Sequence, residues 1–579
     1  MGKRKIGNLW EVIDLKQKET FLCIDLKSFY ASVECVERGL DPFTTNLVVA
    51  DPDRSVSTIC LAITPAMKKL GIRNRCRIHE IPDHIEYIVA KPRMQLYMEY
   101  SARIYGIYLN YMAKEDIHVY SVDECFMDVT RYLSLYHLTA KEMAQKLMDA
   151  VMEETGITAT AGIGTNLYLA KIAMDIVAKH IEDHIGMLDE ISYREQLWEH
   201  KPLSDFWRIG SRTERKLAGY GIQTMGDIAL ASIQSEDWLY KMFGIDAELL
   251  IDHAWGCESC KMSDIKNYHT EEHSLSNGQV LMRNYTIEEA AVVVREMTDV
   301  LVLDLVEKGL VTNSVTLWIA YDHRFERESS KGTVRFPDCT NRSREIIDTV
   351  EALYRKIADP YTGIRRIEII ANKIKPEGYQ QYTLFQDSIK AEKERHLQEA
   401  VLQVKKRYGK NAIMGIQSVG MLHLSREEQS GWRTSCIGGE NMLAEAYQKY
   451  LYVPRPVSKR YPMDVQHRAK QFAPFAALRG FEEIVRKQEI LYEQRKMLSE
   501  EQKCGLDRKL QMVSVGMKIQ ATYFKESREM KPAGQYHTIC GTVEFFDPSI
   551  HLRIDDTIIL IPDLCELSGD IFEELELPC

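Results

Sequence analysis

Short apolar runs rich in β-branched residues alternate with amphipathic helical stretches over residues 20–190, a pattern typical of an α/β or α+β domain. The run TFLCI predicts a buried strand that passes directly into a helix carrying Phe29, Tyr30 and Val33. Residues 41–94 indicate an insertion in this domain, with strands expected in NLVVA, RIHEI and EYIVA and one helix ending in KKLGI.

The rest of the chain divides into regions of different pattern. Glycines punctuate short helices over 200–260, and long helical stretches alternate with strands over 270–375. Residues 376 to about 460 are polar, with one helical run near 388–408, which indicates a mobile tail. The last segment, 461–579, predicts helices followed by short strands, as in a small twisted barrel or sheet. The expected fold class is therefore α+β with several domains.

Composition restricts the class of protein only in part. The 579 residues are enough for roughly four domains, and no apolar run approaches the ~18 residues of a membrane span. The basic N-terminus lacks the apolar core of a secretory signal, so we expect a cytoplasmic protein. Thirteen scattered cysteines indicate reduced thiols, and the lone pair Cys257 and Cys260 favours packing over metal binding. The net charge of −11 argues only mildly against nucleic-acid binding, because an acidic protein can carry a basic groove.

Three acidic residues stand where predicted strands end. Asp25 follows a buried strand, where an uncompensated charge is costly and a metal ion is a suitable partner. Asp123 and Glu124 in VYSVDECFMDV are adjacent, so both can face one site only if the chain turns sharply there. Three convergent carboxylates suit a pair of Mg²⁺ ions that bind substrate phosphates. In the alternative, Asp25 caps the next helix and the other two are solvated turn residues.

Three motifs in one order change this balance. FLCIDLKSFYASVE, VYSVDECFMDV and TAGIGTNLYLAKIAMDIVAK strongly resemble the Y-family DNA polymerases, the UmuC and DinB-like group with its Gram-positive UvrX-like branch, over about residues 20–375. The resemblance implies an α+β multi-domain fold shaped as a right hand. The domains expected from it are a palm at 1–40 and 95–190, small fingers at 41–94, a helical thumb at 191–262, an α/β little finger at 270–375, a flexible tail at 376–455 and a C-terminal module at 456–579.

The resemblance also implies the metal ligands. Asp25, Asp123 and Glu124 match the family's catalytic, metal-binding carboxylates. The backbone carbonyl of Leu26 would add a further ligand. Two Mg²⁺ ions are expected to act there with the incoming deoxynucleoside triphosphate.

Further residues are expected to contact that nucleotide. Tyr30 matches the family's steric gate, whose ring leaves no room for a 2′-hydroxyl, with a core aromatic as the alternative. Phe29 would touch the triphosphate through its backbone amide, although a core role is equally open. Lys171 matches a triphosphate contact. Pro65 and Lys68 stand where the family usually presents a tyrosine and an arginine, so a charge is kept without the bidentate fork and a hydroxyl donor is lost.

The stretch WRIGSRTERKLAGYGIQTMGDIA resembles the helix-hairpin-helix of the family's thumb. Glycines let the backbone approach a DNA phosphate, whose charge is favoured by exposed amides and a helix N-terminus. The implied DNA-binding residues are Gly210, Arg212, Gly219 and Gly221, and a plain helical turn is the alternative. In 270–375, acidic residues are interleaved with the basic ones, so a solvated mixed surface competes with DNA contact for any single arginine.

Two further motifs follow these regions. In QYTLFQD, Gln381, Leu384 and Phe385 match the peptide by which bacterial polymerases dock on the sliding clamp. HRAKQFAPFAALRGFEE and the strands after it resemble the small YolD-like proteins, which implies a regulatory or interaction role with other repair or replication proteins. His467, Arg468 and Lys470 are expected to cap a helix, with DNA contact as the alternative.

The sequence thus predicts a magnesium-dependent DNA-directed DNA polymerase that extends primers opposite damaged template bases with low fidelity, in DNA repair and SOS mutagenesis. Its expected partners are primer-template DNA, deoxynucleoside triphosphates and the sliding clamp. One alternative is a non-catalytic DNA- and clamp-binding scaffold, which the intact carboxylates disfavour. Another is a different palm-domain nucleotidyl enzyme such as a cyclase, which needs no thumb, little finger or clamp peptide.

Overall fold

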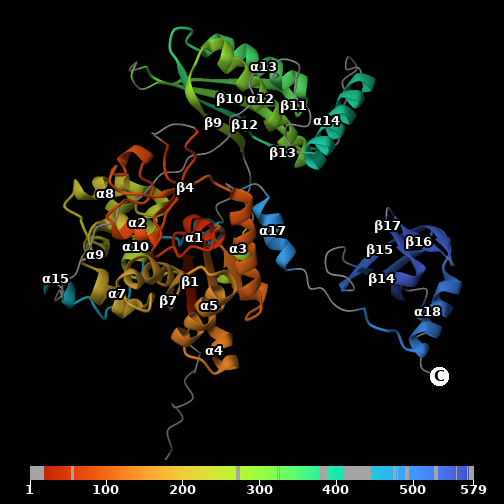
Figure 1. Cartoon of the computed structure of the whole chain (residues 1–579), viewed down its shortest axis with the longest axis horizontal. Coiled ribbons are helices and arrows are strands. Elements are labelled where there is room, and N and C mark those ends of the chain that lie inside the picture. The colour runs from red at the N-terminus through yellow and green to blue at the C-terminus, as the bar shows by residue number, and fades with distance from the viewer. Residues whose placement is uncertain are drawn as a thin grey trace, which may run out of the picture.

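The structure, a computed structural model, contains four β-sheets in the part of the chain that it describes (Figure 1). Within that part, no helix is both long enough and apolar enough to span a membrane. The described residues are 19–53, 58–268, 274–322, 324, 327–378, 388–408, 445–458, 460–473, 478, 480–489, 495–526, 533–548, 550–555, 557–569 and 572.

A five-stranded sheet forms the centre of the first domain, residues 19–190. Its middle strand, β1, pairs antiparallel with β6 on one side and with β7 on the other, and β8 runs parallel to β7. The strands, in their order across the sheet, are β5 (Ile117–Val119), β6 (Glu124–Asp128), β1 (Phe21–Leu26), β7 (Ala159–Gly164) and β8 (Ile185–Leu188).

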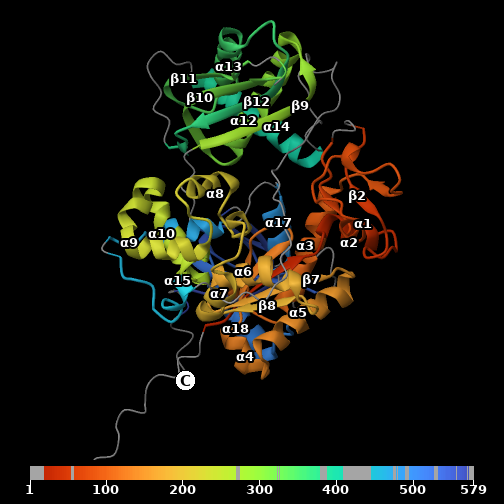
Figure 2. The same ribbon diagram turned by 90° about the vertical axis from the view of Figure 1, so that its left-hand side faces the viewer.

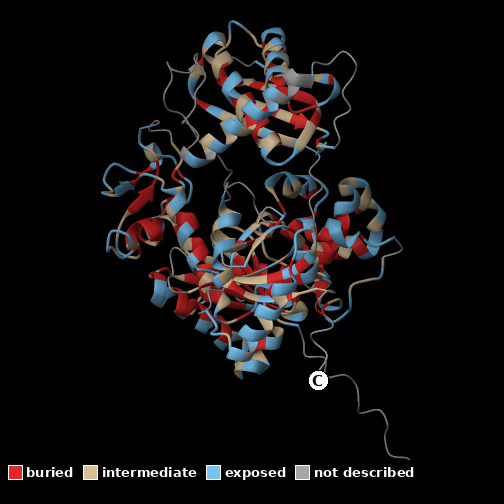
Figure 3. Cartoon of the chain, turned by 90° about the vertical axis from the view of Figure 1, so that its right-hand side faces the viewer, coloured by how far each residue is buried: buried red, intermediate tan, exposed pale blue. Residues whose placement is uncertain are grey.

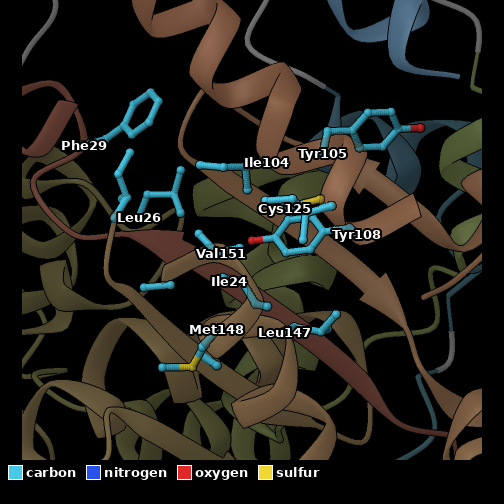
Figure 4. Packing of buried hydrophobic residues seen from close by; sticks show 14 of the residues in the cluster. Ile24, Leu26, Phe29, Ile104, Tyr105, Tyr108, Cys125, Leu147, Met148 and Val151 are labelled. Atoms are coloured by element: carbon cyan, nitrogen blue, oxygen red, sulfur yellow. The ribbon is translucent and has the colours of Figure 1, made fainter. Parts of the chain in front are cut away.

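Alternation along β1 gives the sheet two buried faces (Figure 3). Leu22, Ile24 and Leu26 pack with α1 (Phe29–Val36), α3 (Met94–Leu109) and α5 (Ala140–Thr155), as Figure 4 shows for Ile24 among Ile104, Leu147 and Val151. Phe21 and Cys23 belong to the opposite layer, which contains α6 (Leu167–Ile172) and α11 (Met262–Lys266). The end of β1 is therefore fixed from both sides.

The layer on the second face lies very close to the sheet. A Cβ atom on Gly162 would overlap the backbone of Ala170 and Met174, and one on Gly164 would overlap the backbone of α6. Helix α6 continues directly into a π-helical turn, η3 (Ala173–Val177). The glycines of TAGIG thus allow α6 and η3 to seat directly on β7.

The insertion forms its own small sheet in the order β3-β2-β4. NLVVA contains β2 (Leu47–Val49) and EYIVA contains β4 (Ile88–Ala90), as expected, while β3 is Ala62–Ile63 and the expected helix is α2 (Pro65–Lys69). RIHEI is not a strand but the 3₁₀ turn η1 (Ile78–Glu80), because the Glu80 side chain accepts a hydrogen bond from the Arg77 amide at 3.1 Å and closes the turn.

Residues 190–268 form a helical domain with a core that includes Trp198, Leu217 and Trp255. The indole of Trp198 donates to the Ala254 carbonyl at 2.7 Å, and the two indoles meet edge to face. The helices are α7 (Glu190–Leu197), α8 (Ser211–Ala218), α9 (Met225–Phe243) and α10 (Ala247–Ala254).

A second α/β domain, residues 274–378, packs two helices against a sheet (Figure 2). Residues 388–408, expected to lie in a flexible tail, form α14 (Ser388–Tyr408) beside this domain: Gln398 donates to the Asn341 carbonyl at 2.9 Å, and Lys405 pairs with Asp299 at 2.9 Å. The elements, with strands in sheet order, are β11 (Ser330–Thr340), β10 (Leu310–Tyr321), β12 (Ile364–Asn372) and β9 (Ser274–Tyr285), the short β13 (Lys375–Pro376) on β10, and the helices α12 (Ile287–Glu307) and α13 (Ser343–Ile357).

Residues 445–489, here called the strap, run over the helical domain and the first domain. Its helices are α15 (Glu445–Gln448), α16 (Val465–Ala469) and α17 (Phe481–Gln488). Tyr447 is buried against Gly226 and its hydroxyl lies 3.0 Å from the Thr224 hydroxyl. Phe472 packs edge to face on Phe126 beneath the first sheet. Residues 456–489, which we assigned to the C-terminal module, therefore belong to the surface of the preceding domains.

A buried ion cluster anchors the middle of the strap. Arg468 contacts Glu248 at 3.0 Å, Glu258 at 3.1 Å and also Asp252. Its side chain is almost wholly buried, so it neither caps a helix nor faces solvent, contrary to both expectations for it. One residue of the strap thus pairs with three carboxylates of the helical domain, and Asp252 also pairs with Arg455 of the strap.

The C-terminal domain follows the strap and lies apart from the other domains in Figure 1. As expected, it is mostly β, with one helix packed on a small sheet. Its elements are α18 (Glu500–Met512) and, in sheet order, β17 (Thr557–Leu560), β16 (His551–Ile554), β15 (Gly534–Asp547), β14 (Lys518–Glu526) and β18 (Leu564–Ser568).

Candidate active site

The three predicted carboxylates meet at one end of the first sheet. Asp25 is the cross-strand partner of Glu124 in the β1–β6 ladder, and the Leu26 amide donates to the Asp123 carbonyl at 2.9 Å. The expected sharp turn is present, because the amides of Tyr120 and Ser121 both donate to the Glu124 carbonyl and leave Asp123 just outside the strand.

Mutual repulsion marks this end of the sheet as strongly acidic. Burial raises the pKa of Asp25 well above its usual range, and the neighbouring charges of Asp123 and Glu124 raise it further. Burial also raises the pKa of Glu124, while Lys171 opposes that rise. A cation at this place would relieve the repulsion between the carboxylates.

Lys171 supplies a positive charge from beneath the sheet. Its buried ammonium lies 2.8 Å from Glu124 and 3.0 Å from Asp175, and Cys23 donates to the same Glu124 oxygen at 3.2 Å. Burial lowers the pKa of Lys171, but the two carboxylates outweigh it and hold the pKa above its usual value. The geometry gives Lys171 the task of neutralising Glu124, and its contact with a triphosphate stays a prediction.

A group of lysines lies on the open side of Asp25. Burial and the charge of Lys68 lower the pKa of Lys27 to about 8, although Asp25 opposes the shift. Burial likewise lowers the pKa of Lys68, which also interacts with Asp25 and Lys179. Crowded cations with lowered pKa values suit an anion. Lys27 and Lys179 are absent from the sequence predictions, and the only signal for Lys27 is its place two residues after Asp25.

Pro65 has a structural explanation. It occupies the first position of α2, where its missing amide hydrogen leaves no bond unmade. Thr64 caps the same helix, accepting a hydrogen bond from the Met67 amide at 3.4 Å. The helix therefore presents Lys68 from a well-formed start.

The two aromatic residues after Asp25 point in different directions. Phe29 is 3% exposed and packs in the hydrophobic core, as Figure 4 shows. Its side chain therefore has the core role that was the alternative to nucleotide contact. Tyr30 is half-buried, and burial and the nearby charge of Asp123 raise its pKa. Its ring stacks on Tyr97, with centroids 4.5 Å apart. Of the two, only Tyr30 lies beside the carboxylates with a partly open ring.

The carboxylates and the Leu26 carbonyl are hard oxygen donors of the kind that Mg²⁺ prefers. Among the described residues, no three His, Cys, Asp or Glu side chains are already arranged as a metal cluster. Glu124 points to Lys171, and Asp123 accepts a hydrogen bond from the Ser121 hydroxyl at 2.7 Å. The donor chemistry thus fits a divalent ion, with modest side-chain rotation needed to complete the ligand set.

The glycine hairpin of the helical domain has the expected local shape. Gly221 has φ +81, which requires glycine, whereas Gly219 has ordinary helical angles. Gly210 precedes α8, and Arg212 is exposed on its first turn. DNA contact by these residues stays a prediction, as does the clamp peptide with Gln381, Leu384 and Phe385, which lies outside the described residues.

Comparison with known proteins identifies the family. The impB/mucB/samB family matches residues 24–175, and the C-terminal domain of that family matches residues 272–384. The chain is similar to the UV-damage repair protein UvrX of Bacillus subtilis, with 31% identity over 416 residues that cover 70% of this chain and 94% of UvrX. DNA polymerase IV 2 of the same organism is 29% identical over 436 residues, or 73% of this chain and 99% of that protein.

Among solved structures, the chain is similar to a Y-family DNA polymerase chimera of Dbh and Dpo4, with 20% identity and a TM-score of 0.49, covering 62% of this chain and 99% of the chimera. The two family matches end at residue 384, before the strap begins. The first match includes all three carboxylates of the site together with Lys27, Lys68 and Lys171. The chain belongs to the impB/mucB/samB family of Y-family DNA polymerases.

Proposed function

We propose that this polymerase carries out low-fidelity translesion synthesis, adding deoxynucleotides to a primer opposite damaged template bases. The relatives support this role, since one is named for UV-damage repair and others are named DNA polymerase IV. The observation that carries the proposal is that Asp25, Asp123 and Glu124 converge at one end of the sheet, next to Lys27 and Lys68.

The domains take family roles in this proposal. The first domain is the palm, its insertion the fingers, the helical domain the thumb and the second α/β domain the little finger. Exposed Arg212 and the turn at Gly221 would hold the DNA backbone, because a close-lying main chain can offer amides to phosphate. In the second α/β domain, Arg366 lies over the Trp318 ring and near Glu368, so part of its charge is already compensated.

The active-site residues divide the chemical work. Asp25, Asp123, Glu124 and the Leu26 carbonyl would hold two Mg²⁺ ions. These ions would activate the primer hydroxyl and stabilise the charge on the phosphorus and the leaving pyrophosphate.

The chain's own groups do the rest. Lys27, Lys68 and Lys179 would neutralise the triphosphate, and the ring of Tyr30 would exclude a 2′-hydroxyl. Lys171 pairs with Glu124 at 2.8 Å and favours its ionised form against the effect of burial.

Two attachments complete the proposal. The QYTLF peptide would bind the sliding clamp, which raises the local concentration of the enzyme at the primer end. The C-terminal domain, with its resemblance to YolD-like proteins, would contact other repair or replication proteins.

Asp123→Ala tests the catalytic assignment. Asp123 is half-buried and bonded only locally to Ser121, so the fold should tolerate its loss. We expect primer extension to fall by about 10³-fold or more while affinity for primer-template DNA is unchanged. Asp149→Ala, which removes an exposed carboxylate on α5, is the matched control and should retain full extension. Full extension by Asp123→Ala would refute the catalytic role of Asp123, and absence of extension by the wild-type chain would favour a DNA-binding scaffold.

A further inference from the structure

A stacked pair of tyrosines joins α1 to α3 beside the active site. The ring of Tyr97 lies on the ring of Tyr30, with centroids 4.5 Å apart and planes 17° apart. Tyr97 has no exposed surface, whereas Tyr30 is only half-buried. One face of the Tyr30 ring is therefore covered by a residue that is itself held in the core.

The far end of Tyr97 is fixed by a buried carboxylate. The Tyr97 hydroxyl donates to Glu34 Oε1 at 2.8 Å. Arg93 binds both oxygens of the same carboxylate, at 2.9 and 2.8 Å, and Arg38 also pairs with it. Such bidentate, charge-assisted bonds set orientation as well as energy.

Glu34 is therefore a charged anchor. Burial would raise the pKa of its carboxyl, but the hydrogen bonds from Arg93, Arg38 and Tyr97 outweigh burial and hold the pKa below its usual value. Its side chain has no exposed surface. Because the arginines hold the Glu34 carboxylate in place, the Tyr97 hydroxyl that donates to it is held in place as well.

We propose that Tyr97 is a positioning residue for sugar selection, which fixes the ring of Tyr30 while Glu34 fixes Tyr97. The inference rests on the proposed function, in which Tyr30 excludes the 2′-hydroxyl. A single oxygen atom separates the two sugars, so a gate discriminates only if its ring cannot swing aside by about 1 Å. Tyr97 blocks that movement because it occupies the space behind the ring.

The same two helices supply a matched control. Tyr100, three residues further along α3, donates its hydroxyl at 2.7 Å to Glu37, the residue that directly follows α1. It forms a second tyrosine–glutamate pair between α3 and α1. Tyr100→Leu thus removes a comparable ring and bridge between these helices without removing the stack on Tyr30.

The test measures single-nucleotide incorporation by the full-length enzyme opposite an undamaged template base. The readout is the ratio of kcat/KM for a deoxynucleotide to kcat/KM for the matching ribonucleotide. Tyr97→Leu should lower this ratio about three- to tenfold, mainly through a lower KM for the ribonucleotide. Tyr97→Phe keeps the ring and should stay within about twofold of the wild type. Tyr100→Leu should leave the ratio unchanged.

The outcomes separate the inference from its premise. A wild-type ratio for Tyr97→Leu, or an equal loss for Tyr100→Leu, overturns the inference. If Tyr97→Leu does not fold, Tyr97→Met fills the space with a flexible side chain and is judged by the same ratio. Tyr30→Ala is measured in parallel, and an unchanged ratio there refutes the gate itself.

Discussion

Lysine side chains lie on two sides of the carboxylates at the end of β1. Beneath the sheet, Lys171 is buried and saturated by Glu124 and Asp175. On the open side, burial lowers the pKa values of Lys27 and Lys68. The charge of Lys68 adds to the shift of Lys27, and the charge of Lys179 adds to the shift of Lys68. The first arrangement stabilises the carboxylates. In the second, a bound anion would stabilise the charged form of the lysines.

This difference predicts a pH dependence for nucleotide binding. A lysine whose pKa is about 8 is charged at pH 7 and largely neutral at pH 9, so affinity should fall as the pH rises through 8. We expect KM for the deoxynucleotide to rise about three- to tenfold between pH 7 and pH 9. Lys27→Arg keeps its charge over this range and should flatten the rise. A wild-type KM that does not change, or an equal rise in Lys27→Arg, contradicts the prediction.

Single residues were predictable from the sequence where a motif carries them. Asp25, Asp123 and Glu124 could be named because each lies in a recognisable strand-end motif, and the turn between the strands follows from their adjacency. Lys27 and Lys179 could not, because they are over 150 residues apart in the chain and only the fold brings each of them near Lys68. The separation of two residues along the chain does not reveal whether the fold brings them together.

At the scale of elements, backbone contact decides how α6 and η3 sit on the sheet. Gly162 and Gly164 leave no room for a side chain, since the helix backbone fills the space above them. The same contact sets how close Lys171, which lies on α6, comes to Glu124 of the sheet. A strand that is a short apolar run, such as β1, could be predicted. The strand expected in RIHEI was wrong, because the local hydrogen bond from the Arg77 amide to the Glu80 side chain closes a turn there.

Gly162→Ala tests this close seating. The added methyl group must push α6 and η3 away from β7, so we expect the free energy of unfolding of the first domain to fall by about 1–3 kcal/mol or more. Scanning calorimetry, which separates transitions of different domains, is the measurement. Gly505→Ala on α18 is the control, because open space surrounds that glycine and alanine favours the helix by up to about 1 kcal/mol. An unchanged transition in Gly162→Ala would show that the layer can move freely.

At the scale of the whole molecule, the first domain and the helical domain are held together by a segment that follows the family domains. The strap contacts the helical domain through Tyr447 and Arg468, the first sheet through Phe472, and α3 through Glu489, which accepts a hydrogen bond from Tyr105 at 2.9 Å (Figure 2). The sequence could not reveal this role. Local pattern in HRAKQFAPFAALRGFEE shows helices, but the acidic partners of Arg468 lie more than 200 residues earlier in the chain.

Two shortened chains test whether the strap belongs to the polymerase body. A chain that ends at residue 489 lacks only the C-terminal domain and should keep both primer extension and the thermal midpoint of the body. A chain that ends at residue 444 loses the buried ion pairs of Arg468 with Glu248, Asp252 and Glu258, and this loss should cost about 3–5 kcal/mol. Arg468→Met in the full chain should reproduce most of that loss, whereas Arg486→Met, which breaks only an exposed pair with Glu482, should not. Equal midpoints for the two shortened chains would contradict this, and would mean that the helical domain holds to the first domain by its own contacts.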